Sequence, residues 1–373
     1  MREINIALIG YNFMGKAHSY ALGNVNFFFP NKIRLNKKVI VGRTLNLLKQ
    51  AAEEYGWLEY STDWREVILR DDIDVVCIAT PTSSHKEIAI EAAKAGKHVL
   101  CEKPLGMNAE EARQMWIAVK DVEIVHMVGH NYRRVPAIAL AKKLIDEGKL
   151  GNIYHFRGCY LQDWLADPRA PMSWRLDKEI AGSGAHGDLN AHLIDLARYL
   201  VGEMDQVIGV EKTFVHQRGE GNSQANVTVD DSTAFLAKFA NGATGTFEAS
   251  RMASGRKNHN SLEINGSKGS LFFDFEHMNE LGFWSKEDEL EVQGFRKIIV
   301  TEDTHPYMKA WWPAGHLLGY QNTFVNQYAD FIHAIINKTK VEPNFYDGWM
   351  CNQVLDSVST SIDTLTWEKI RGS

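Results

Sequence analysis

A chain of 373 residues is long enough for two domains, and its 45% hydrophobic content supplies a sizeable core. The formal net charge of −6 without a long basic run disfavours a nucleic-acid partner, and no apolar stretch is long enough for a membrane span. The four cysteines form no Cys-x-x-Cys motif and no basic leader precedes the first apolar run, so we expect a cytoplasmic protein with reduced thiols.

The first third of the chain alternates short apolar runs with stretches of helical periodicity. Strands are predicted at residues 4–9, 39–41, 74–79, 98–101 and 124–128, and helices from Met14 and over 45–55, 85–95 and 109–119. This alternation indicates a doubly wound parallel sheet with helices on both faces, which binds ligands at the carboxyl ends of its strands. We expect this first domain to span residues 1–129.

The pattern changes after residue 130. Helices are predicted over 136–148, 187–201, 322–336 and 348–364, and a long strand over 153–162. Between residues 207 and 275 strand-like runs recur, with the hairpin signals Asn241-Gly242 and Asn265-Gly266. We expect a second domain, residues 130–373, in which helices cover one face of an antiparallel sheet.

A glycine-bounded segment, residues 10–15, lies between the first predicted strand and the first helix. It matches the dinucleotide fingerprint Gly-x-Gly-x-x-Gly except that Asn12 replaces the middle glycine. Gly10 would let the chain turn tightly, Gly15 would let the helix pack closely on the strand, and the helix N-terminus would attract a pyrophosphate. The alternative is a turn that binds nothing.

The second predicted strand ends in Val-Gly-Arg-Thr, residues 41–44, where a carboxylate would normally bind the adenosine ribose of NAD. Arg43 favours NADP or tolerance of both cofactors, although it could equally stack on adenine. Thr80-Pro81 ends the third strand and Glu102-Lys103-Pro104 follows the fourth, both where a cofactor would lie. Pro104 would help to hold Lys103 in one direction.

Asp188 and His192 are four residues apart in a predicted helix, so they share one of its faces. The carboxylate could orient the imidazole, which suits a general base that takes a hydroxyl proton while a hydride leaves the same carbon. Lys103 could stabilise the developing alkoxide. The alternative is an acidic helix start followed by a structural histidine. His186 lies nearby, but no third ligand stands at a telling distance, so we expect no metal.

Together these motifs resemble the Gfo/Idh/MocA oxidoreductases. The matches follow the family's order: the glycine turn, Ala79-Thr80-Pro81, Glu102-Lys103-Pro104, residues 131–134, and Gly187-Asp188-x-x-x-His192. The resemblance implies an N-terminal Rossmann domain followed by an α+β domain with a large, open, mainly antiparallel sheet.

Within the family the chain is most similar to glycoside 3-dehydrogenases, through residues 13–19, 131–136, 160–164, 173–175 and 180–184. The resemblance implies hydride transfer from a sugar-ring carbon, C3, to NAD, with Lys103, Asp188 and His192 as catalytic residues. The sequence departs from the family's pattern at His186, where an apolar residue is usual, and at Arg43, which leaves NADP possible. We expect substrate contacts from Lys103, Gln162, His186, Asp188 and His192. We expect cofactor contacts from Gly10, Asn12, Phe13, Met14, Arg43, Thr80, Pro81, His85, Glu102, Lys103, Asn131, Trp174 and Arg175.

Three functions fit this pattern. The first is an NAD(P)-dependent dehydrogenase of a sugar, glycoside or anhydrosugar, with an inositol or cyclitol dehydrogenase as its variant. The second is a glycoside-cleaving enzyme that uses NAD transiently, and the third is a non-catalytic sugar or nucleotide sensor. The presence of Lys103, Asp188 and His192 favours an enzyme. By analogy with the family we expect a dimer or tetramer. The enzyme hypothesis requires the Lys103 ammonium and the His192 imidazole to converge at the nicotinamide ring.

Overall fold

The computed structural model describes residues 2–31, 33–219 and 224–370. It divides into two compact units, of which the first contains residues 1–134 and 319–349 and the second contains residues 135–318 and 350–373. The sequence predicts instead an uninterrupted second domain from residue 130. The difference arises because helix α9 (Tyr320–Asn337) packs against helix α1 (Phe13–Phe28) of the first unit.

A six-stranded sheet forms the centre of the first unit, in the order β3-β2-β1-β4-β5-β6. Every neighbouring pair is parallel, which gives the predicted Rossmann arrangement. The central strand β4 is apolar throughout and all four of its residues are buried, as expected for a strand with both faces covered by helices. The strands are β1 (Arg2–Ile9), β2 (Ile33–Val41), β3 (Glu59–Ser61), β4 (Val75–Ile78), β5 (His98–Cys101) and β6 (His126–Val128).

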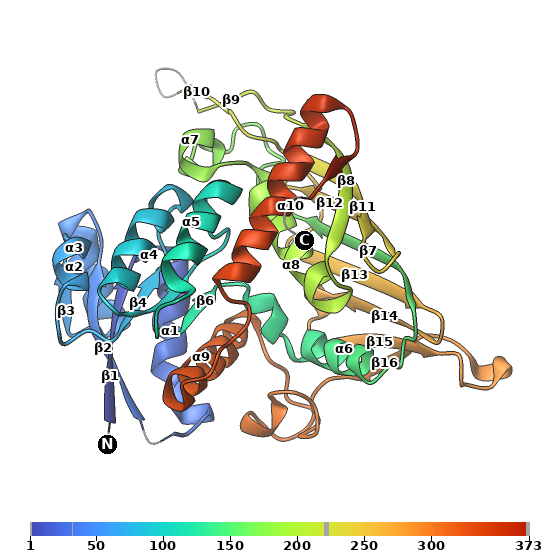
Figure 1. Cartoon of the computed structure of the whole chain (residues 1–373), viewed down its shortest axis with the longest axis horizontal. Coiled ribbons are helices and arrows are strands. Elements are labelled where there is room, and N and C mark those ends of the chain that lie inside the picture. Colours follow the sequence, from blue (N-terminus) through green and yellow to red (C-terminus); the bar gives the residue numbers. More distant parts are fainter. Residues whose placement is uncertain (1, 32, 220–223, 371–373) are drawn as a thin grey trace. The chain divides into compact units, whose positions relative to one another are not determined.

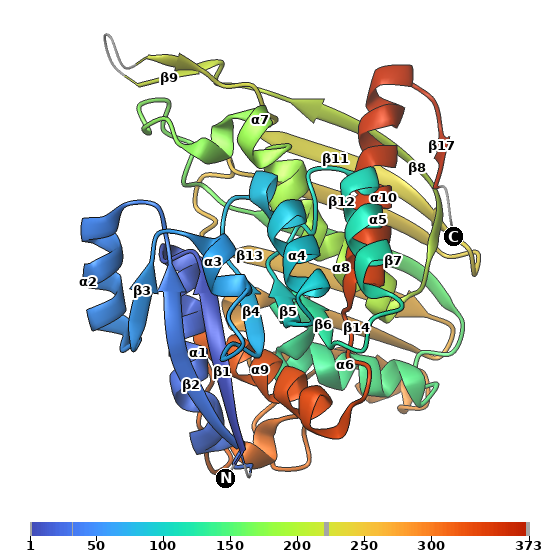
Figure 2. The same cartoon turned by 60° about the vertical axis from the view of Figure 1, so that its left-hand side comes forward.

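The helices of the first unit connect these strands and pack on the sheet (Figure 2). Helices α3, α4 and α5 contact one another in sequence, whereas α1 contacts α2 and α9. The helices that follow the strands are α2 (Leu45–Tyr55), α3 (Trp64–Ile68), α4 (His85–Lys94) and α5 (Ala109–Val119), with short 3-10 turns η1 (Thr82–Ser84) and η2 (Asn131–Arg134). Helix α10 (Phe345–Thr364) begins in this unit and continues into the second.

A nine-stranded sheet forms the second unit, in the order β16-β15-β14-β13-β7-β12-β11-β8-β17. Most neighbours are antiparallel, as predicted, but β7 and β12 are parallel, so the sheet is mixed. The strands are β7 (Ile153–Leu161), β8 (Met204–Lys212), β11 (Ser232–Phe239), β12 (Thr244–Ser250), β13 (His259–Gly266), β14 (Gly269–Asp274), β15 (Glu280–Ser285), β16 (Arg296–Ile299) and β17 (Glu368–Lys369). A separate two-stranded ribbon pairs β9 (Gln217–Arg218) with β10 (Ala225–Asn226).

One face of this sheet is covered by helices (Figure 1). Burial alternates along β11 and β12, the pattern of strands with one covered and one open face. On the covered face Phe235 and Phe247 stack with ring centres 4.2 Å apart, and Phe247 also stacks on Phe156. The helical segments are α6 (Pro136–Asp146), η3 (Trp174–Leu176), α7 (Lys178–Ala181), η4 (His186–Asn190), α8 (Ala191–Leu200), η6 (Phe275–His277), η7 (Leu290–Val292) and η8 (Met308–Ala310).

Across the described residues, no helix combines the length and the apolar character needed to cross a membrane.

Candidate active site

The turn after β1 requires glycine at both of its ends. Gly10 has a φ of +112°, and a Cβ there would lie 2.3 Å from the carbonyl oxygen of Ala79. A Cβ at Gly15 would lie 2.3 Å from the carbonyl oxygen of Gly10. Both distances are far shorter than a van der Waals contact, so side chains are excluded where the chain enters α1. The two outer positions of the dinucleotide fingerprint therefore have the steric role that the sequence predicts.

The N-terminus of α1 is suited to a phosphate group. Asn12 occupies the N-cap position, but its side chain makes no capping hydrogen bond, and the first turn contains no acidic residue. Because helix N-termini carry partial positive charge and unpaired amides, this end fits the pyrophosphate of a dinucleotide. Beside it, the exposed ring of Phe13 stacks on Tyr320 with ring centres 6.1 Å apart, while Met14 is partly buried.

The end of β2 carries no carboxylate. Arg43 is exposed directly after the strand, at the position where the adenosine ribose is expected. Next to it, a Cβ at Gly42 would lie 2.2 Å from the ring of Tyr11, so that ring packs directly on the backbone of residue 42. The geometry leaves Arg43 accessible to either a ribose or a ribose phosphate.

His85 connects the loops that follow β4 and β5. Its Nε2 lies 2.9 Å from the carbonyl oxygen of Thr80 and its Nδ1 lies 3.1 Å from that of Pro104. The side chain is buried, and burial lowers its pKa. Pro81 links Thr80 to η1. His85 thus lies between the two loops expected at the cofactor, and its neutral ring donates one hydrogen bond to one of the two carbonyl oxygens.

Glu102, directly before Lys103, belongs to a buried chain of polar groups. Its Oε1 lies 3.0 Å from Nε2 of His18, and its Oε2 accepts the backbone N–H of Lys103 at 3.3 Å. The Nδ1 of His18 lies 3.0 Å from the hydroxyl of Tyr328, which lies 3.0 Å from Sγ of Cys77. Glu102 is only 5% exposed. The carboxylate therefore supports the backbone at Lys103, whose own side chain is partly exposed.

The donors and acceptors of this chain can all be matched. Burial raises the pKa of the Cys77 thiol to about 12 and raises the pKa of Tyr328 well above its usual value, so both groups remain protonated. A carboxylate accepts hydrogen bonds, so His18 donates from Nε2 and accepts the Tyr328 hydroxyl at Nδ1. The thiol of Cys77 then donates to the Tyr328 oxygen. In this arrangement each of the four groups has a hydrogen-bond partner inside the unit.

Asn131 is fixed in the same unit by α9. Its Nδ2 donates to Oγ1 of Thr323 at 2.8 Å, and the side chain is 3% exposed. Two residues later, Arg133 pairs with Asp347 at 3.4 Å. The segment after β6 is therefore held by residues from the end of the chain.

In the second unit, Asp188 lies within η4, a single π-helical turn, and His192 lies in the first turn of α8. The sequence predicts one regular helix over both residues. Asp230 holds the start of the π turn, because its carboxylate accepts the backbone N–H groups of Gly184 at 2.7 Å and His186 at 2.8 Å. Such π turns are common at functional sites.

Arg251, directly after β12, is the ionic partner of Asp188. Its Nη2 donates to Oδ2 of Asp188 at 2.8 Å, and the arginine side chain is 1% exposed. The ring of Tyr160 lies 5.8 Å from the ring of His192. A buried guanidinium therefore restrains the carboxylate, and an aromatic ring lies against the imidazole.

His186, expected to contact substrate, has both ring nitrogens engaged inside the unit. Nε2 lies 3.0 Å from the carbonyl oxygen of Leu355, and Nδ1 lies 3.1 Å from Nδ2 of Asn190. Burial lowers the pKa of His186, which favours a neutral ring that donates at Nε2 and accepts at Nδ1. Both ring nitrogens are therefore used inside the unit, and a contact of His186 with substrate stays a prediction.

The remaining expected residues of the second unit lie near Arg251. Gln162 follows β7, and its amide contacts Trp164 and Asn258. Trp174 and Arg175 lie in η3, with the guanidinium 4.5 Å from the indole ring, and the carbonyl oxygen of Arg175 lies 3.5 Å from Nη1 of Arg251. Their expected contact with the cofactor remains a prediction.

Sequence reasoning missed four residues that support these groups: His18, Arg251, Asn258 and Tyr328. His18 stood within one of the stretches that carry the family resemblance, at residues 13–19. The other three lie far along the chain from the residues that they contact, and their sequence surroundings contain no recognisable motif.

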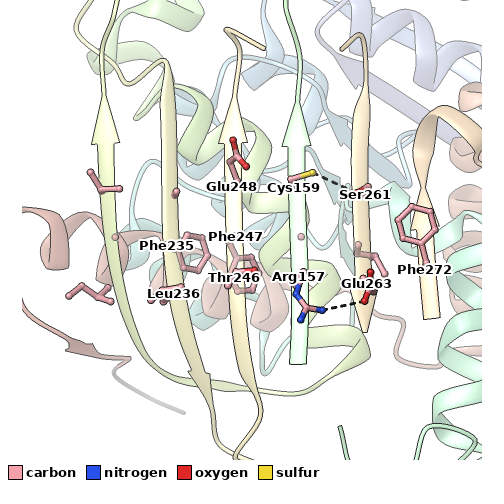
Figure 3. A pocket seen from close by; sticks show the side chains of 16 residues that line it. Arg157, Cys159, Phe235, Leu236, Thr246, Phe247, Glu248, Ser261, Glu263 and Phe272 are labelled. Atoms are coloured by element: carbon pink, nitrogen blue, oxygen red, sulfur yellow. Dashed lines mark hydrogen bonds and ion pairs between the residues drawn. The ribbon is translucent and has the colours of Figure 1, made fainter. Parts of the chain in front are cut away.

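A pocket occupies the open face of the nine-stranded sheet (Figure 3). Arg157, Leu236, Thr246, Glu263 and Phe272 line it, and none of the predicted site residues is among its lining. We therefore do not assign it to catalysis.

A possible metal-binding group was also found among the described residues. His259, Asp274 and Glu276 bring three potential ligand atoms within 4.8 Å of one another. Asp274 already bonds His259 at 3.0 Å and Arg256 pairs with Glu276 at 3.3 Å. These contacts account for the cluster as an ion-pair network, so we assign no metal to it.

Comparison with known proteins places the chain in a family. Residues 4–130 match the family described as "Oxidoreductase family, NAD-binding Rossmann fold", and residues 138–272 match the GFO/IDH/MocA C-terminal domain. The chain is 45% identical to levoglucosan dehydrogenase of Pseudarthrobacter phenanthrenivorans, with 98% of each chain covered. It is 32% identical to scyllo-inositol 2-dehydrogenase (NAD(+)) of Bacillus subtilis, over 72% of this chain and 73% of that one.

Solved structures agree with these matches. The structure of levoglucosan dehydrogenase in complex with NADH and levoglucosan has a TM-score of 0.97 and 45% identity, covering 99% of this chain and 100% of that one. An oxidoreductase domain protein from Kribbella flavida has a TM-score of 0.97 and 49% identity, covering 99% and 100%. From the glycine turn, the two sheets and these matches, we conclude that the chain is an oxidoreductase of the Gfo/Idh/MocA family with an NAD-binding Rossmann domain.

Proposed function

We propose that the protein is an NAD-dependent dehydrogenase that oxidises a secondary ring hydroxyl of a sugar, glycoside or anhydrosugar to a ketone. The observation that carries this proposal is the 45% identity with levoglucosan dehydrogenase across 98% of both chains. It is supported by the chemistry of the second unit, where Asp188, His192 and Gln162 offer a carboxylate, an imidazole and an amide for hydroxyl groups. We propose C3 as the oxidised carbon.

Each catalytic residue has a distinct task in this proposal. Bound NAD supplies the hydride acceptor. Oxidation removes a hydride from the ring carbon and a proton from its hydroxyl oxygen, and His192 takes that proton as the general base. The Lys103 ammonium stabilises the negative charge that develops on the same oxygen. Asp188, held by Arg251 at 2.8 Å, accepts a hydrogen bond from a neighbouring hydroxyl of the sugar and so orients the sugar ring. These roles require Lys103 and His192 to meet at the nicotinamide.

The proposed cofactor preference rests on the relatives, because the end of β2 carries no carboxylate that would select NAD. Two solved structures of levoglucosan dehydrogenase contain NADH together with a sugar. We propose NAD as the working cofactor of this chain, with Arg43 allowing measurable use of NADP because it can pair with a ribose phosphate.

The experiment that tests this function is a screen of glycosides, anhydrosugars and inositols against NAD and NADP, followed by absorbance of the reduced cofactor. We expect a glycoside or anhydrosugar with NAD to give the highest kcat/KM, and NMR of the product to show a 3-keto ring. Release of free sugar without NADH would instead indicate NAD-assisted glycoside cleavage. Sugar binding without any turnover would indicate a sensor.

We further propose that the protein is a cytoplasmic homo-oligomer. All four cysteines are free, in keeping with a reducing compartment. Val210, Leu236 and Phe272 expose 64%, 48% and 41% of their surface beside the pocket on the open sheet face, an apolar area that a second copy would cover (Figure 3). Light scattering after size exclusion would measure the assembly, and Leu236→Lys should weaken it. A monomeric wild-type protein would contradict this proposal.

A further inference from the structure

Three polar side chains converge at the edge of the covered face of the nine-stranded sheet. Tyr160 lies near the end of β7 and Gln162 just beyond it, two residues apart and therefore on one face. Asn258 directly precedes β13, which pairs with β7. The Tyr160 hydroxyl donates to Oδ1 of Asn258 at 2.6 Å, and Nε2 of Gln162 donates to the same oxygen at 3.0 Å. One amide oxygen thus uses both of its lone pairs to join the two strands.

The second end of the Gln162 amide is also fixed. Its Oε1 accepts the indole N–H of Trp164 at 3.0 Å. Because one end accepts and the other donates, the amide can adopt only one of its two flipped orientations without losing a hydrogen bond. The side chain therefore presents one N–H and one lone pair in defined directions.

These contacts continue to both proposed catalytic residues of the second unit. The Arg251 guanidinium lies 5.4 Å from the ring of Trp164 and donates to Asp188 at 2.8 Å. At the other end, the ring of Tyr160 lies 5.8 Å from that of His192. Asp188 and His192 are joined through their own helical segment. We call this series of seven residues, which closes through the backbone between Asp188 and His192, the amide ring: Asp188, Arg251, Trp164, Gln162, Asn258, Tyr160 and His192.

Exposure varies systematically around the amide ring. Arg251 is 1% exposed and Tyr160 is 4% exposed, whereas Trp164 is 43% exposed. Gln162 and Asn258 are partly buried. This arrangement suits a polyol. Its hydroxyl groups can bond the amides of Gln162 and Asn258 beside the buried His192, and its C–H faces can pack on the indole of Trp164.

We propose that Asn258 is a positioning residue for the sugar, which fixes Gln162 and Tyr160 in their binding orientations. This inference rests on the proposed function, since it takes the second unit as the sugar side. Without the Asn258 oxygen, Gln162 would lose the partner of its N–H and its amide could rotate. The donors for a sugar hydroxyl would then have to be ordered during binding, at a cost to affinity.

The test compares Asn258→Ala with Asn258→Asp in the full-length protein. Asp has the same shape and keeps an oxygen that accepts from both Tyr160 and Gln162. We expect Asn258→Ala to raise KM for the sugar about tenfold, equivalent to one lost hydrogen bond, while kcat changes less than about threefold and KM for NAD is unchanged. Asn258→Asp should restore KM to within about threefold of wild type.

Two further variants keep the test decisive. Asn265→Ala, in the strand that Asn258 precedes but bonded to Arg157 on the open face, is the matched control and should leave all constants unchanged. Trp164→Phe keeps the ring but removes the donor to Gln162, and should raise the sugar KM by a smaller factor even if Asn258→Ala is unstable.

Defined results would overturn the inference. It fails if Asn258→Ala leaves the sugar KM within about twofold of wild type while Gln162→Ala raises it, or if Asn258→Asp is as impaired as Asn258→Ala. Failure of the proposed function gives a different result, because the wild-type protein would then reduce NAD with none of the sugars.

Discussion

Around Lys103 the supporting groups are buried and bond the backbone, whereas around Asp188 and His192 buried side chains contact the side chains themselves and lead outward to the exposed Trp164. Glu102 accepts the backbone N–H of Lys103, His18 bonds Glu102, and Tyr328 bonds His18. Asp188, by contrast, is held directly by a guanidinium and retains 31% side-chain exposure. The difference indicates that the first region holds the backbone of Lys103 in place. In the second region, substitution of one side chain can change the orientation of another.

The largest expected effect comes from removing the two proposed catalytic groups. Lys103→Ala and His192→Ala should each lower turnover about 10²–10⁴-fold, because the proposed mechanism uses each group to move or stabilise charge at the reacting oxygen. Affinity for NAD, measured by calorimetry, should change less than about threefold. Lys94→Ala, on an exposed face of α4, is the matched control. Near-normal rates in both active-site variants would contradict the assigned chemistry.

A smaller effect should follow from loss of the Arg251 guanidinium. Arg251→Met removes the guanidinium that bonds Asp188, and we expect kcat to fall about tenfold to a hundredfold. Arg251→Lys keeps the charge but not the planar donor pair, so it should recover only part of the activity. Arg256→Met, at an exposed pair with Glu276, serves as control. If Arg251→Met retained full kcat, turnover would not depend on the side-chain contacts around Asp188 and His192.

Acid should weaken the first unit through a buried imidazole. Burial lowers the pKa of His126 to about 4, and its Nδ1 accepts the backbone N–H of Phe345 at 3.2 Å. The unfolded chain binds a proton near pH 6.5 and the folded chain does not, so stability falls as the pH drops from about 7 to 5.

The expected loss from His126 alone is about 2 kcal/mol between pH 7 and pH 5. Urea unfolding at both pH values would measure it, and His126→Gln, which keeps an acceptor for Phe345, should remove this part of the pH dependence. An unchanged pH dependence in the variant would show that the imidazole is not charged on unfolding.

The smallest effect on turnover should come from Tyr328→Phe, which deletes one hydroxyl from the buried chain. His18 and Cys77 would each lose a partner, and we expect the free energy of unfolding to fall by about 1–3 kcal/mol. Turnover should change less than about threefold, because Glu102 still bonds the backbone of Lys103. Tyr20→Phe, on the exposed face of α1, is the control. A large loss of turnover without a loss of stability would show that the buried chain behind Lys103 acts in turnover rather than in stabilising the fold.

Much of the fold follows from sequence because local patterns determine it. Five of the six strands of the first sheet contain the apolar runs that the sequence predicts, and the glycine turn has the expected steric role. Strand β3 has only three residues, none of them buried, so it has no hydrophobic pattern to detect. The parallel pairing of β7 with β12 was missed because hairpin signals report only neighbours along the chain.

The candidate site divides in the same way. Lys103, Asp188 and His192 stand in short motifs, so they could be named from sequence, although their convergence remains a prediction. Arg251 and Asn258 lie in no motif, and they contact Asp188 and Gln162 only because the strands of the second sheet pair across long separations. The π turn at residues 186–190 also has no sequence signal, since it depends on the Asp230 carboxylate.

The return of residues 319–349 to the first unit has a consequence during protein synthesis. Tyr328 and Thr323, which bond His18 and Asn131, leave the ribosome only after nearly the whole chain has been translated. The nucleotide-binding half, although encoded first, therefore cannot finish folding first, contrary to the usual N-terminal order. Until α9 arrives, the apolar surface of α1 that receives it is uncovered, so nascent chains that stall before residue 319 should recruit chaperones.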